Sequence, residues 1–230
     1  MGRFLLKRRW KMICGIDEAG RGPVIGPMVV AAIWMEEEDE KKLIDLGIRD
    51  SKKVGRQKRE KLADYLKRKF YYEMKVVKPE DIDALRQAMT MNELEAYIFA
   101  NLANKRMASV YYIDAASANE KKFEELFKKN LKFDSMIVCE HEADVNYPIV
   151  SAASIIAKVE RDRQIKGIAK MLQSKLDMPL GSGYPSDKRT INFIKAWIKK
   201  YNELPPYTRH SWDTIRKIKN EMTQKKLGEY

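Results

Sequence analysis

Residues 15–27 read GIDEAGRGPVIGP, an apolar approach that ends in two adjacent acids, Asp17 and Glu18. A glycine-rich segment follows the acids: Gly20, Arg21, Gly22, Pro23 and Gly26. Buried strands seldom end in paired charges, because an ionised carboxylate is costly to bury alone. Glycine permits close approach of the backbone, and arginine offers a fork of donors to a phosphate. The stretch predicts a strand that ends in a functional turn, although an ordinary tight turn between paired strands has the same composition.

Outward from this stretch, apolar runs bounded by turn residues predict strands over 12–16, 24–35 and 71–77, a fourth within 109–117 that ends at Asp114, and a fifth over 135–144. Helical spacing predicts helices over 56–70, 79–89, 92–106, 119–131 and 150–171, and a Gly/Pro loop over 178–187 precedes a basic helical tail. We expect the first two strands to form a hairpin-like antiparallel pair. The later alternation of strand and helix predicts an α/β fold, a mixed sheet with helices packed on it.

The charge of the chain favours a polyanionic partner. The formal net charge is +12, and residues 187–230 hold eleven Lys or Arg against five Asp or Glu. Such a positive potential attracts phosphate and raises encounter rates. The sequence therefore favours nucleic acid as a partner.

The two cysteines, Cys14 and Cys139, lie inside apolar runs, which is typical of buried free thiols in a reducing compartment. No apolar run approaches the length that spans a membrane, and the apolar stretch near the N-terminus is too short for a signal peptide. We expect a cytoplasmic monomer without membrane association.

Four acids follow predicted strands: Asp17, Glu18, Asp114 and Asp144. If these strands run parallel, the four carboxylates converge on one edge of the sheet. Like charges at close range raise one another's pKa unless cations compensate, and hard oxygen ligands suit Mg²⁺ or Mn²⁺. For each acid taken singly, the alternative is a solvated residue at the end of a strand.

A row of polar residues follows the last of these acids on the predicted 150–171 helix: Ser151, Ser154, Lys158 and Arg161. Their spacing of three or four places them on one face, beside an apolar one. Two hydroxyls and two cations in a row suit a phosphodiester backbone. A simple solvated face is the alternative.

Several stretches together resemble ribonuclease HII, the type 2 ribonuclease H: GIDEAGRGPVIGPMVVAA from residue 15, DSKK (50–53), YYIDA (111–115), HEADVNYPIVSAASIIAKVERDR (141–163) and GSGYPSD (181–187). The motif HEAD (141–144) and the residues around it are similar to the archaeal branch of this family. The resemblance implies an RNase H-like fold, a mixed five-stranded sheet flanked by helices with a small C-terminal helical extension. It also implies a catalytic domain over 1–177 and a basic helical region over 178–230 that completes the substrate cleft.

The resemblance implies a catalytic and metal-binding role for four acids: Asp17, Glu18, Asp114 and Asp144. Glu140 and Glu142 are near neighbours of Asp144 on the same segment. The implied mechanism uses two Mg²⁺ or Mn²⁺ ions, one activating water and the other steadying the leaving 3′-oxygen. The implied substrate is the RNA strand of an RNA/DNA hybrid, or a single ribonucleotide in duplex DNA, and the products carry 5′-phosphate and 3′-hydroxyl ends.

The resemblance further implies substrate contacts. Gly20, Arg21 and Gly22 would read the ribonucleotide 2′-hydroxyl and the adjoining phosphate. Tyr184 would pack on the following deoxyribose, with a surface tyrosine as the alternative, and Lys52 would contact a phosphate, with a solvated lysine as the alternative.

Asn92 is matched in part of the family by an asparagine that contacts substrate. Asn92 and Glu95 also have the spacing of a capping box, and we favour the cap.

Two other functions fit part of the sequence. A non-catalytic nucleic-acid-binding module would explain the basic charge but not four convergent acids, which repel phosphate without metal. A metal-dependent phosphatase of small substrates would explain the acids but not the basic tail. Mg²⁺-dependent cleavage would exclude the first, and a steep salt dependence of substrate binding would exclude the second.

The C-terminus, QKKLGEY, carries Gln224, Leu227 and Tyr230 in the spacing Q-x-x-aliphatic-x-x-aromatic. This spacing is similar to the peptide with which replication proteins bind a sliding clamp. A short tail can place a leucine and a ring in one apolar pocket of a partner. A basic helical tail with a solvated tyrosine is the alternative.

Overall fold

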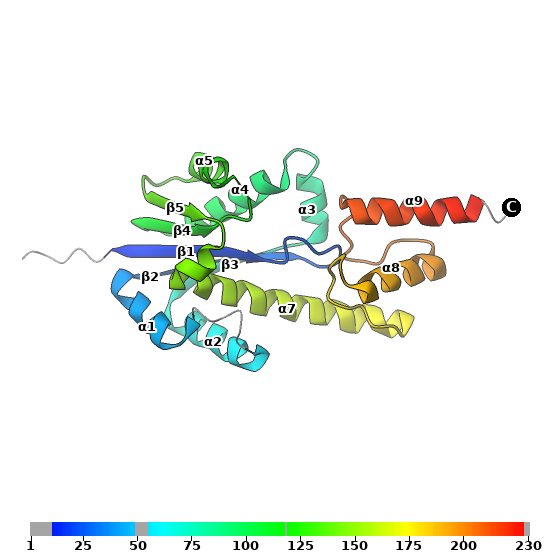
Figure 1. Cartoon of the computed structure of the whole chain (residues 1–230), viewed down its shortest axis with the longest axis horizontal. Helices are drawn as coiled ribbons and strands as arrows, with labels where there is room; N and C mark the ends of the chain where they lie inside the picture. Colours follow the sequence, from blue (N-terminus) through cyan, green and yellow to red (C-terminus); the bar gives the residue numbers. More distant parts are fainter. Residues whose placement is uncertain (1–10, 49–54, 118, 228–230) are drawn as a thin grey trace, which may run out of the picture. The chain divides into compact units, whose positions relative to one another are not determined.

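One five-stranded sheet with helices around it makes up the part of the chain that this computed structural model describes, residues 11–48, 55–117 and 119–227 (Figure 1). The strands are β1 (Met12–Ala19), β2 (Met28–Glu36), β3 (Tyr71–Val77), β4 (Val110–Asp114) and β5 (Met136–Glu140). The helices are η1 (Glu37–Asp39), α1 (Glu40–Asp45), α2 (Arg56–Lys69), α3 (Pro79–Leu85), α4 (Met91–Ala103), α5 (Glu120–Asn130), α6 (Ala143–Asn146), α7 (Pro148–Leu176), α8 (Lys188–Tyr201) and α9 (Asp213–Leu227). The sheet is mixed, in the order β3-β2-β1-β4-β5, and β1, β4 and β5 run parallel.

This architecture confirms the predicted α/β fold, but two predicted strands are too long. β2 begins at Met28 rather than Val24, because Gly26, with a φ of +101°, and Pro27 turn the chain before it. β5 ends at Glu140, and Glu142 adopts a left-handed φ of 57° before α6 begins. The short helices η1 and α1 follow β2 and were not predicted.

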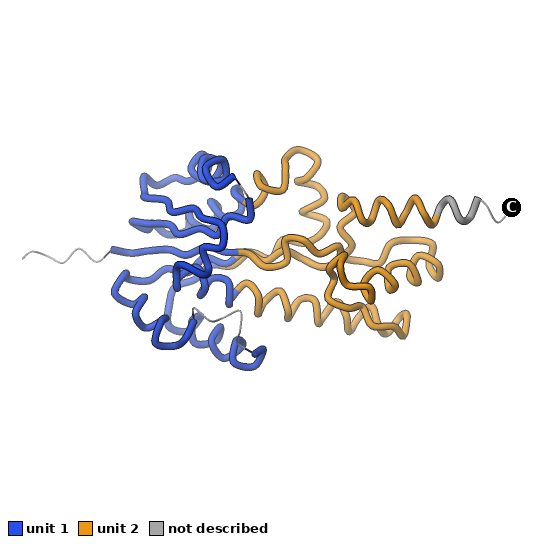
Figure 2. The backbone as a smooth tube through the Cα atoms, viewed as in Figure 1, with its two compact units in different colours: residues 1–17, 31–73, 96–156 blue, residues 18–30, 74–95, 157–230 orange. Residues whose placement is uncertain are grey.

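Contacts within the chain divide it into two compact units, coloured separately in Figure 2. Unit 1 comprises residues 1–17, 31–73 and 96–156, and unit 2 comprises residues 18–30, 74–95 and 157–230. Each unit is therefore assembled from segments far apart in the sequence. The predicted division into residues 1–177 and 178–230 concerns function and stays a prediction.

The parallel register in unit 1 brings two acids to one edge of the sheet. Ile16 of β1 pairs with Ile113 of β4, so the next residues, Asp17 and Asp114, lie side by side at the carboxyl ends of their strands. On the other side of β4, Asp114 pairs with Glu140 of β5.

A close approach between strand and helix defines the neighbouring face of the sheet. A Cβ atom at Gly15 of β1 would lie only 2.5 Å from the carbonyl oxygen of Ile149, in the first turn of α7. Side chains alternate along a strand, so Gly15 and Asp17 share a face. The start of α7 therefore lies on the face of the sheet that carries the Asp17 side chain.

Unit 2 has a hydrophobic core of its own. Its buried members come from the glycine-rich turn, from α7 and from the C-terminal helices: Val24, Ile25, Ile168, Leu172, Leu180, Phe193, Ile194, Trp197, Ile198, Ile215 and Ile218. The basic C-terminal region thus buries apolar residues against the residues that follow Gly20-Arg21-Gly22. Among the described helices of both units, none is long and apolar enough to cross a membrane.

Candidate active site

Three acids of unit 1 form a compact group, here called the acidic triad: Asp17, Asp114 and Asp144. One carboxylate oxygen of each lies within 4.8 Å of the other two. Asp17 and Asp144 are buried, with 3% and 4% of their surface exposed, and Asp114 is half-buried. Three carboxylates this close repel one another strongly in the absence of a cation.

The third acid reaches the group from a helix rather than from a strand. Asp144 was expected at the end of the fifth strand, but it lies in α6, beyond the end of β5. The backbone N–H of Ala143 donates to Asp114 Oδ1 over 3.3 Å, and the Ser151 hydroxyl donates to the backbone carbonyl of Asp144. These bonds fix α6 between β4 and the start of α7.

Glu140, one of the two acidic neighbours of Asp144 on the same segment, has other partners. It lies two strands from Asp17, about 10 Å at the usual spacing between strands. Its carboxylate accepts from the Tyr147 hydroxyl over 2.6 Å and from the Asn146 amide over 3.2 Å. The bond to Glu140 and burial raise the pKa of Tyr147 to about 12. Glu140 therefore serves to hold the α6 segment.

The acidic triad fits a divalent cation. Opposite ligands of Mg²⁺ lie about 4.2 Å apart, since each bond is about 2.1 Å long. The oxygens of the triad are within 4.8 Å of one another, so small side-chain adjustments close the difference. An all-carboxylate donor set selects hard ions such as Mg²⁺ or Mn²⁺ over softer metals.

Glu18 is not part of the triad. Successive side chains of a strand point to opposite faces, and Glu18 follows Asp17 within β1. Its predicted role as a fourth ligand stays a prediction.

The turn after β1, here called the glycine loop (residues 20–27), belongs to unit 2. A buried arginine, Arg209, holds this loop, and no role was predicted for it from the sequence. Arg209 has no exposed surface. Its guanidinium donates to three backbone carbonyls of the loop: Gly20 (2.6 Å), Arg21 (2.7 Å) and Gly26 (3.0 Å).

The side chain of Arg21 is also held. Its Nε donates to Glu95 over 2.8 Å and its Nη2 to Asn92 over 2.6 Å, and Glu95 is fully buried. The prediction that Asn92 and Glu95 form a capping box is therefore wrong. The box is made two residues earlier: the backbone N–H of Thr90 donates to the Glu93 carboxylate over 2.7 Å, and that of Glu93 donates to the Thr90 hydroxyl over 3.3 Å.

The tyrosine loop (residues 178–187) packs against the glycine loop in unit 2. The carbonyl of Gly183 accepts from the backbone N–H groups of Val24 (2.8 Å) and Ile25 (3.2 Å). Tyr184 is close to Gly22, since a Cβ atom there would be 3.7 Å from the ring. The structure therefore brings together the predicted ribonucleotide reader and the predicted deoxyribose contact.

Arg161 of α7 joins these two loops. Its Nη2 donates to the Ser182 carbonyl over 2.6 Å, and its guanidinium lies 5.0 Å from the centre of the Tyr184 ring. A Cβ atom at Gly20 would be 3.1 Å from Arg161 Cγ. Arg161 therefore fixes the ring of Tyr184 beside the glycine loop.

The predicted polar face of α7 is not a solvated face. Ser151 and Ser154 are fully buried, Arg161 is 9% exposed, and Lys158 is half-buried. The hydroxyl of Ser151 is used within the protein, as described above. Contacts of these residues with substrate stay predictions.

Two predicted sites lie outside the described residues. Lys52 is not described, and neither is Tyr230. Gln224 and Leu227 lie within α9, but the description of side chains stops before them.

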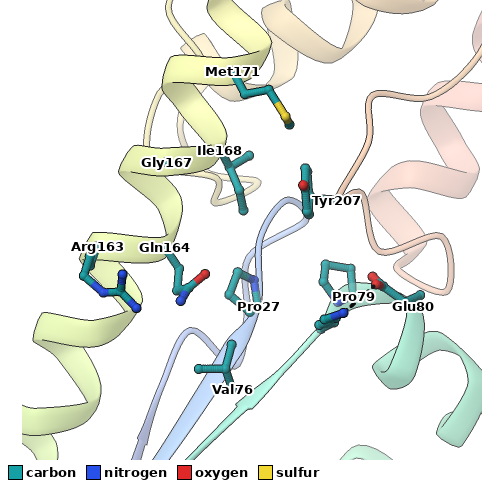
Figure 3. A pocket seen from close by; sticks show the side chains of 11 residues that line it. Pro27, Val76, Pro79, Glu80, Arg163, Gln164, Gly167, Ile168, Met171 and Tyr207 are labelled. Atoms are coloured by element: carbon teal, nitrogen blue, oxygen red, sulfur yellow. Dashed lines mark ion pairs between the residues drawn. The ribbon is translucent and has the colours of Figure 1, made fainter.

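A pocket of about 620 Å³ lies elsewhere in unit 2 (Figure 3). It is lined by Pro27, Val76, Lys78, Pro79, Glu80, Arg163, Gln164, Gly167, Ile168, Met171 and Tyr207. In Figure 3 Arg163 and Glu80 lie on opposite sides, with Pro27 between them. None of the predicted catalytic or substrate-binding residues lines this pocket, so the expected chemistry is not placed there.

Comparison with known proteins identifies the family. The family model described as Ribonuclease HII matches residues 14–215. The chain belongs to the ribonuclease HII family. It is 44% identical to the ribonuclease HII of Methanocella arvoryzae, over 98% of this chain and 100% of the relative. Archaeal ribonuclease HII proteins are its curated relatives at about 41–44% identity, which confirms the predicted branch.

Solved ribonuclease HII structures agree with the fold. The crystal structure of ribonuclease H2 from Pyrococcus horikoshii matches with a TM-score of 0.82 and 41% identity, covering 92% of this chain and 99% of that one. The structure of the PCNA:RNase HII complex from Archaeoglobus fulgidus matches with a TM-score of 0.76 and 37% identity, covering 88% of this chain and 95% of that one.

Family membership confirms the predicted enzyme, a ribonuclease HII of class EC 3.1.26.4 that acts on RNA/DNA hybrids. A non-catalytic binding module and a phosphatase of small substrates are both excluded by the family.

Proposed function

We propose that this ribonuclease HII hydrolyses the RNA strand of hybrids, and the bond at a single ribonucleotide embedded in duplex DNA, with divalent cations bound at the acidic triad. The observation that carries the proposal is the convergence of three carboxylate oxygens within 4.8 Å at the carboxyl edge of the parallel strands. Asp17, Asp114 and Asp144 would hold the cations, and Glu18 would supply a further carboxylate from the adjacent position on β1.

Divalent cations at such a site supply an activated water and neutralise the charge that develops on the scissile phosphate. The chain's own contribution is to hold the carboxylates in place. The buried positions of Asp17 and Asp144 keep competing water away, and the Ala143 N–H fixes one oxygen of Asp114. A site ordered in this way needs little rearrangement when substrate arrives.

Recognition of the ribonucleotide is assigned to the glycine loop. Residues 20–22 would contact the 2′-hydroxyl and the adjoining phosphate through backbone groups and through the guanidinium of Arg21. Tyr184 would stack on the deoxyribose that follows, with its ring held by Arg161. Lys52, Ser151, Ser154 and Lys158 would contribute further contacts along the backbone. The high positive charge of the chain supports a duplex as the ligand.

Three matched duplexes test this function. A labelled DNA duplex with one ribonucleotide, the same duplex without it, and a continuous RNA/DNA hybrid are incubated with Mg²⁺ or with EDTA. We expect cleavage of the first and third only, only with Mg²⁺, and products with 5′-phosphate and 3′-hydroxyl ends. Cleavage in EDTA would refute the metal site, and equal cleavage of the all-DNA duplex would refute ribonucleotide recognition.

A sliding clamp is the proposed protein partner. The A. fulgidus relative has been solved in a complex with PCNA, and the spacing of Gln224, Leu227 and Tyr230 suits such a docking peptide. Deletion of residues 224–230 should abolish clamp binding and leave cleavage of a short duplex unchanged. The control is the double variant Lys225→Ala, Lys226→Ala, which keeps the three motif positions. Undiminished clamp binding by the truncated chain would contradict the docking role.

A cytoplasmic location is proposed from the cysteines. Cys14 and Cys139 are buried free thiols, and burial raises the pKa of both. Thiols of this kind suit a reducing compartment.

A further inference from the structure

Arg209 forms a network with the glycine loop that the expected chemistry leaves unexplained. The arginine is 188 positions from Arg21 in the sequence, yet it donates to the loop's carbonyls through Nε, Nη1 and Nη2. All of these groups belong to unit 2. The side chain is fully buried, so it cannot contact substrate itself.

The direction of these bonds determines what the loop presents. The peptide groups are trans, and in a planar trans peptide the C=O and N–H bonds point in opposite directions. Arg209 pulls the carbonyls of Gly20 and Arg21 toward itself. The N–H groups that share those peptides, from Arg21 and Gly22, are therefore directed to the opposite side of the loop. Two successive N–H groups on one side form a concavity that suits an anion or a hydroxyl oxygen.

The segment that carries Arg209 is itself anchored on both sides. Its backbone N–H donates to Val24 over 2.9 Å, and the Gly26 N–H donates to Tyr207 over 3.0 Å. Beyond it, the carboxylate of Asp83 accepts from the backbone N–H groups of His210 (2.7 Å) and Ser211 (3.0 Å). The guanidinium is thus held in one place rather than hinged on a mobile chain.

The chemistry of arginine suits this position. A planar fork with five donors can satisfy three carbonyls at once, which an ammonium on a flexible stem cannot do with the same geometry. Burial lowers the pKa of Arg209 to about 9, so the side chain remains largely cationic at neutral pH. Charge-assisted bonds to carbonyls are stronger than neutral ones.

We propose that Arg209 is a positioning residue for ribonucleotide recognition: by fixing the carbonyls of Gly20 and Arg21, it aims the N–H groups of Arg21 and Gly22 at the substrate. The inference rests on the proposed role of the glycine loop. It predicts that Arg209 determines how well the enzyme distinguishes a ribonucleotide from a deoxyribonucleotide, independently of the metal site.

The test is a ratio of dissociation constants, measured with full-length protein in Ca²⁺ on an all-DNA duplex and on the same duplex with one ribonucleotide. A ratio is insensitive to the fraction of folded protein, which affects both measurements equally. For Arg209→Lys, which keeps the charge, we expect the preference for the ribonucleotide to fall about tenfold, while Mn²⁺ binding without substrate stays unchanged. For Arg209→Gln, the preference for the ribonucleotide should fall at least as far.

A core variant controls for loss of stability. Leu172→Ala removes a buried side chain of the unit 2 core but none of the bonds that Arg209 donates to the glycine loop, so it should lower Tm and leave the preference unchanged. If Arg209→Lys keeps the wild-type preference, the inference is wrong although the proposed function stands. The inference is equally wrong if Leu172→Ala lowers the preference to the same degree. If the wild-type protein shows no preference, the proposed recognition fails and the inference falls with it.

Discussion

The acidic triad and the glycine loop come closest in the sequence at Asp17, which stands just before the loop, but they are built by different means. The triad is built mainly by neighbouring strands, because the register of β1 with β4 sets Asp17 beside Asp114. The glycine loop has no such repeating ladder. It is held by side chains from distant segments, Arg209 on its carbonyls and Glu95 on the side chain of Arg21.

The difference predicts how each region responds to mutation. A triad residue can lose its charge without loss of fold, since the strands that carry it are held by backbone bonds and apolar contacts. The loop depends on a few buried polar contacts, and a buried polar group that loses its partner is costly. Mutations at the triad should therefore affect turnover, and mutations around the loop should affect recognition and stability together.

The largest effect is expected at the triad. Asp17→Asn and Asp114→Asn should each lower kcat by about 10³-fold or more, because neutralising a ligand weakens cation binding. Thermal unfolding and duplex binding should stay close to wild type. Turnover is measured on a duplex with one ribonucleotide at saturating Mg²⁺, and wild-type turnover in either variant would refute the metal assignment.

The next effect is expected from Gly20→Ala. Gly20 has a φ of +81°, and an added Cβ would lie 2.8 Å from the carbonyl oxygen of Pro27. The left-handed conformation alone costs an alanine about 1–2 kcal/mol, so we expect a lower Tm and a loss of activity of about 10–100-fold.

Gly167→Ala is the matched control for Gly20→Ala. Gly167 lies within α7, and nothing is within 4 Å of the position of an added Cβ. This variant should be as stable as wild type or more stable, because alanine favours a helix over glycine. Equal Tm values for the two variants would contradict the claim that the left-handed backbone at residue 20 requires glycine.

A smaller effect is expected from Glu95→Gln, which keeps the shape of the side chain and removes the charge that holds Arg21. We expect KM for the duplex with one ribonucleotide to rise about tenfold with little change in kcat, because Arg21 loses its orientation. Glu93→Gln, on the same helix, disturbs the capping box with Thr90 and keeps Glu95 in place for Arg21, so it should leave KM unchanged. Identical KM values for the Glu95 variant and wild type would refute the claim that Glu95 orients Arg21 for substrate binding.

The smallest and most selective effect is expected from Tyr184→Ala. The ring is placed beside Gly22 by Arg161, where it could stack on a deoxyribose after the ribonucleotide. Cleavage at a lone ribonucleotide should fall several-fold more than cleavage within a continuous hybrid. Equal losses on the two substrates would assign the ring a structural role only.

The sequence predicted the triad better than the loop, for physical reasons. Asp17 and Asp114 each follow an apolar run, and parallel strands align their ends, so their proximity could be expected. Asp144 was named from the strand pattern as well as from the family resemblance, but its place on α6 was not predicted, because that turn interrupts the strand pattern.

The partners of the glycine loop left weaker signals. Glu95 occupies a helix position on the same face as the buried Ile98, Phe99 and Leu102, and a charge on an apolar face is a sign of a buried partner. Arg209 stands in a polar loop segment with no periodicity. Its contact with a loop so distant in the sequence follows only from the folded chain.

The central claim is that the cation site consists of Asp17, Asp114 and Asp144. The most direct measurement is the Mg²⁺ dependence of cleavage by the wild-type protein and by the variants Asp144→Asn and Glu140→Gln. The substrate is the duplex with one ribonucleotide. We expect no cleavage by wild type without Mg²⁺, a loss of about 10³-fold for Asp144→Asn, and a Mg²⁺ dependence close to wild type for Glu140→Gln, whose carboxylate is bonded to Tyr147. Full activity of Asp144→Asn, or a loss confined to Glu140→Gln, would contradict the assignment.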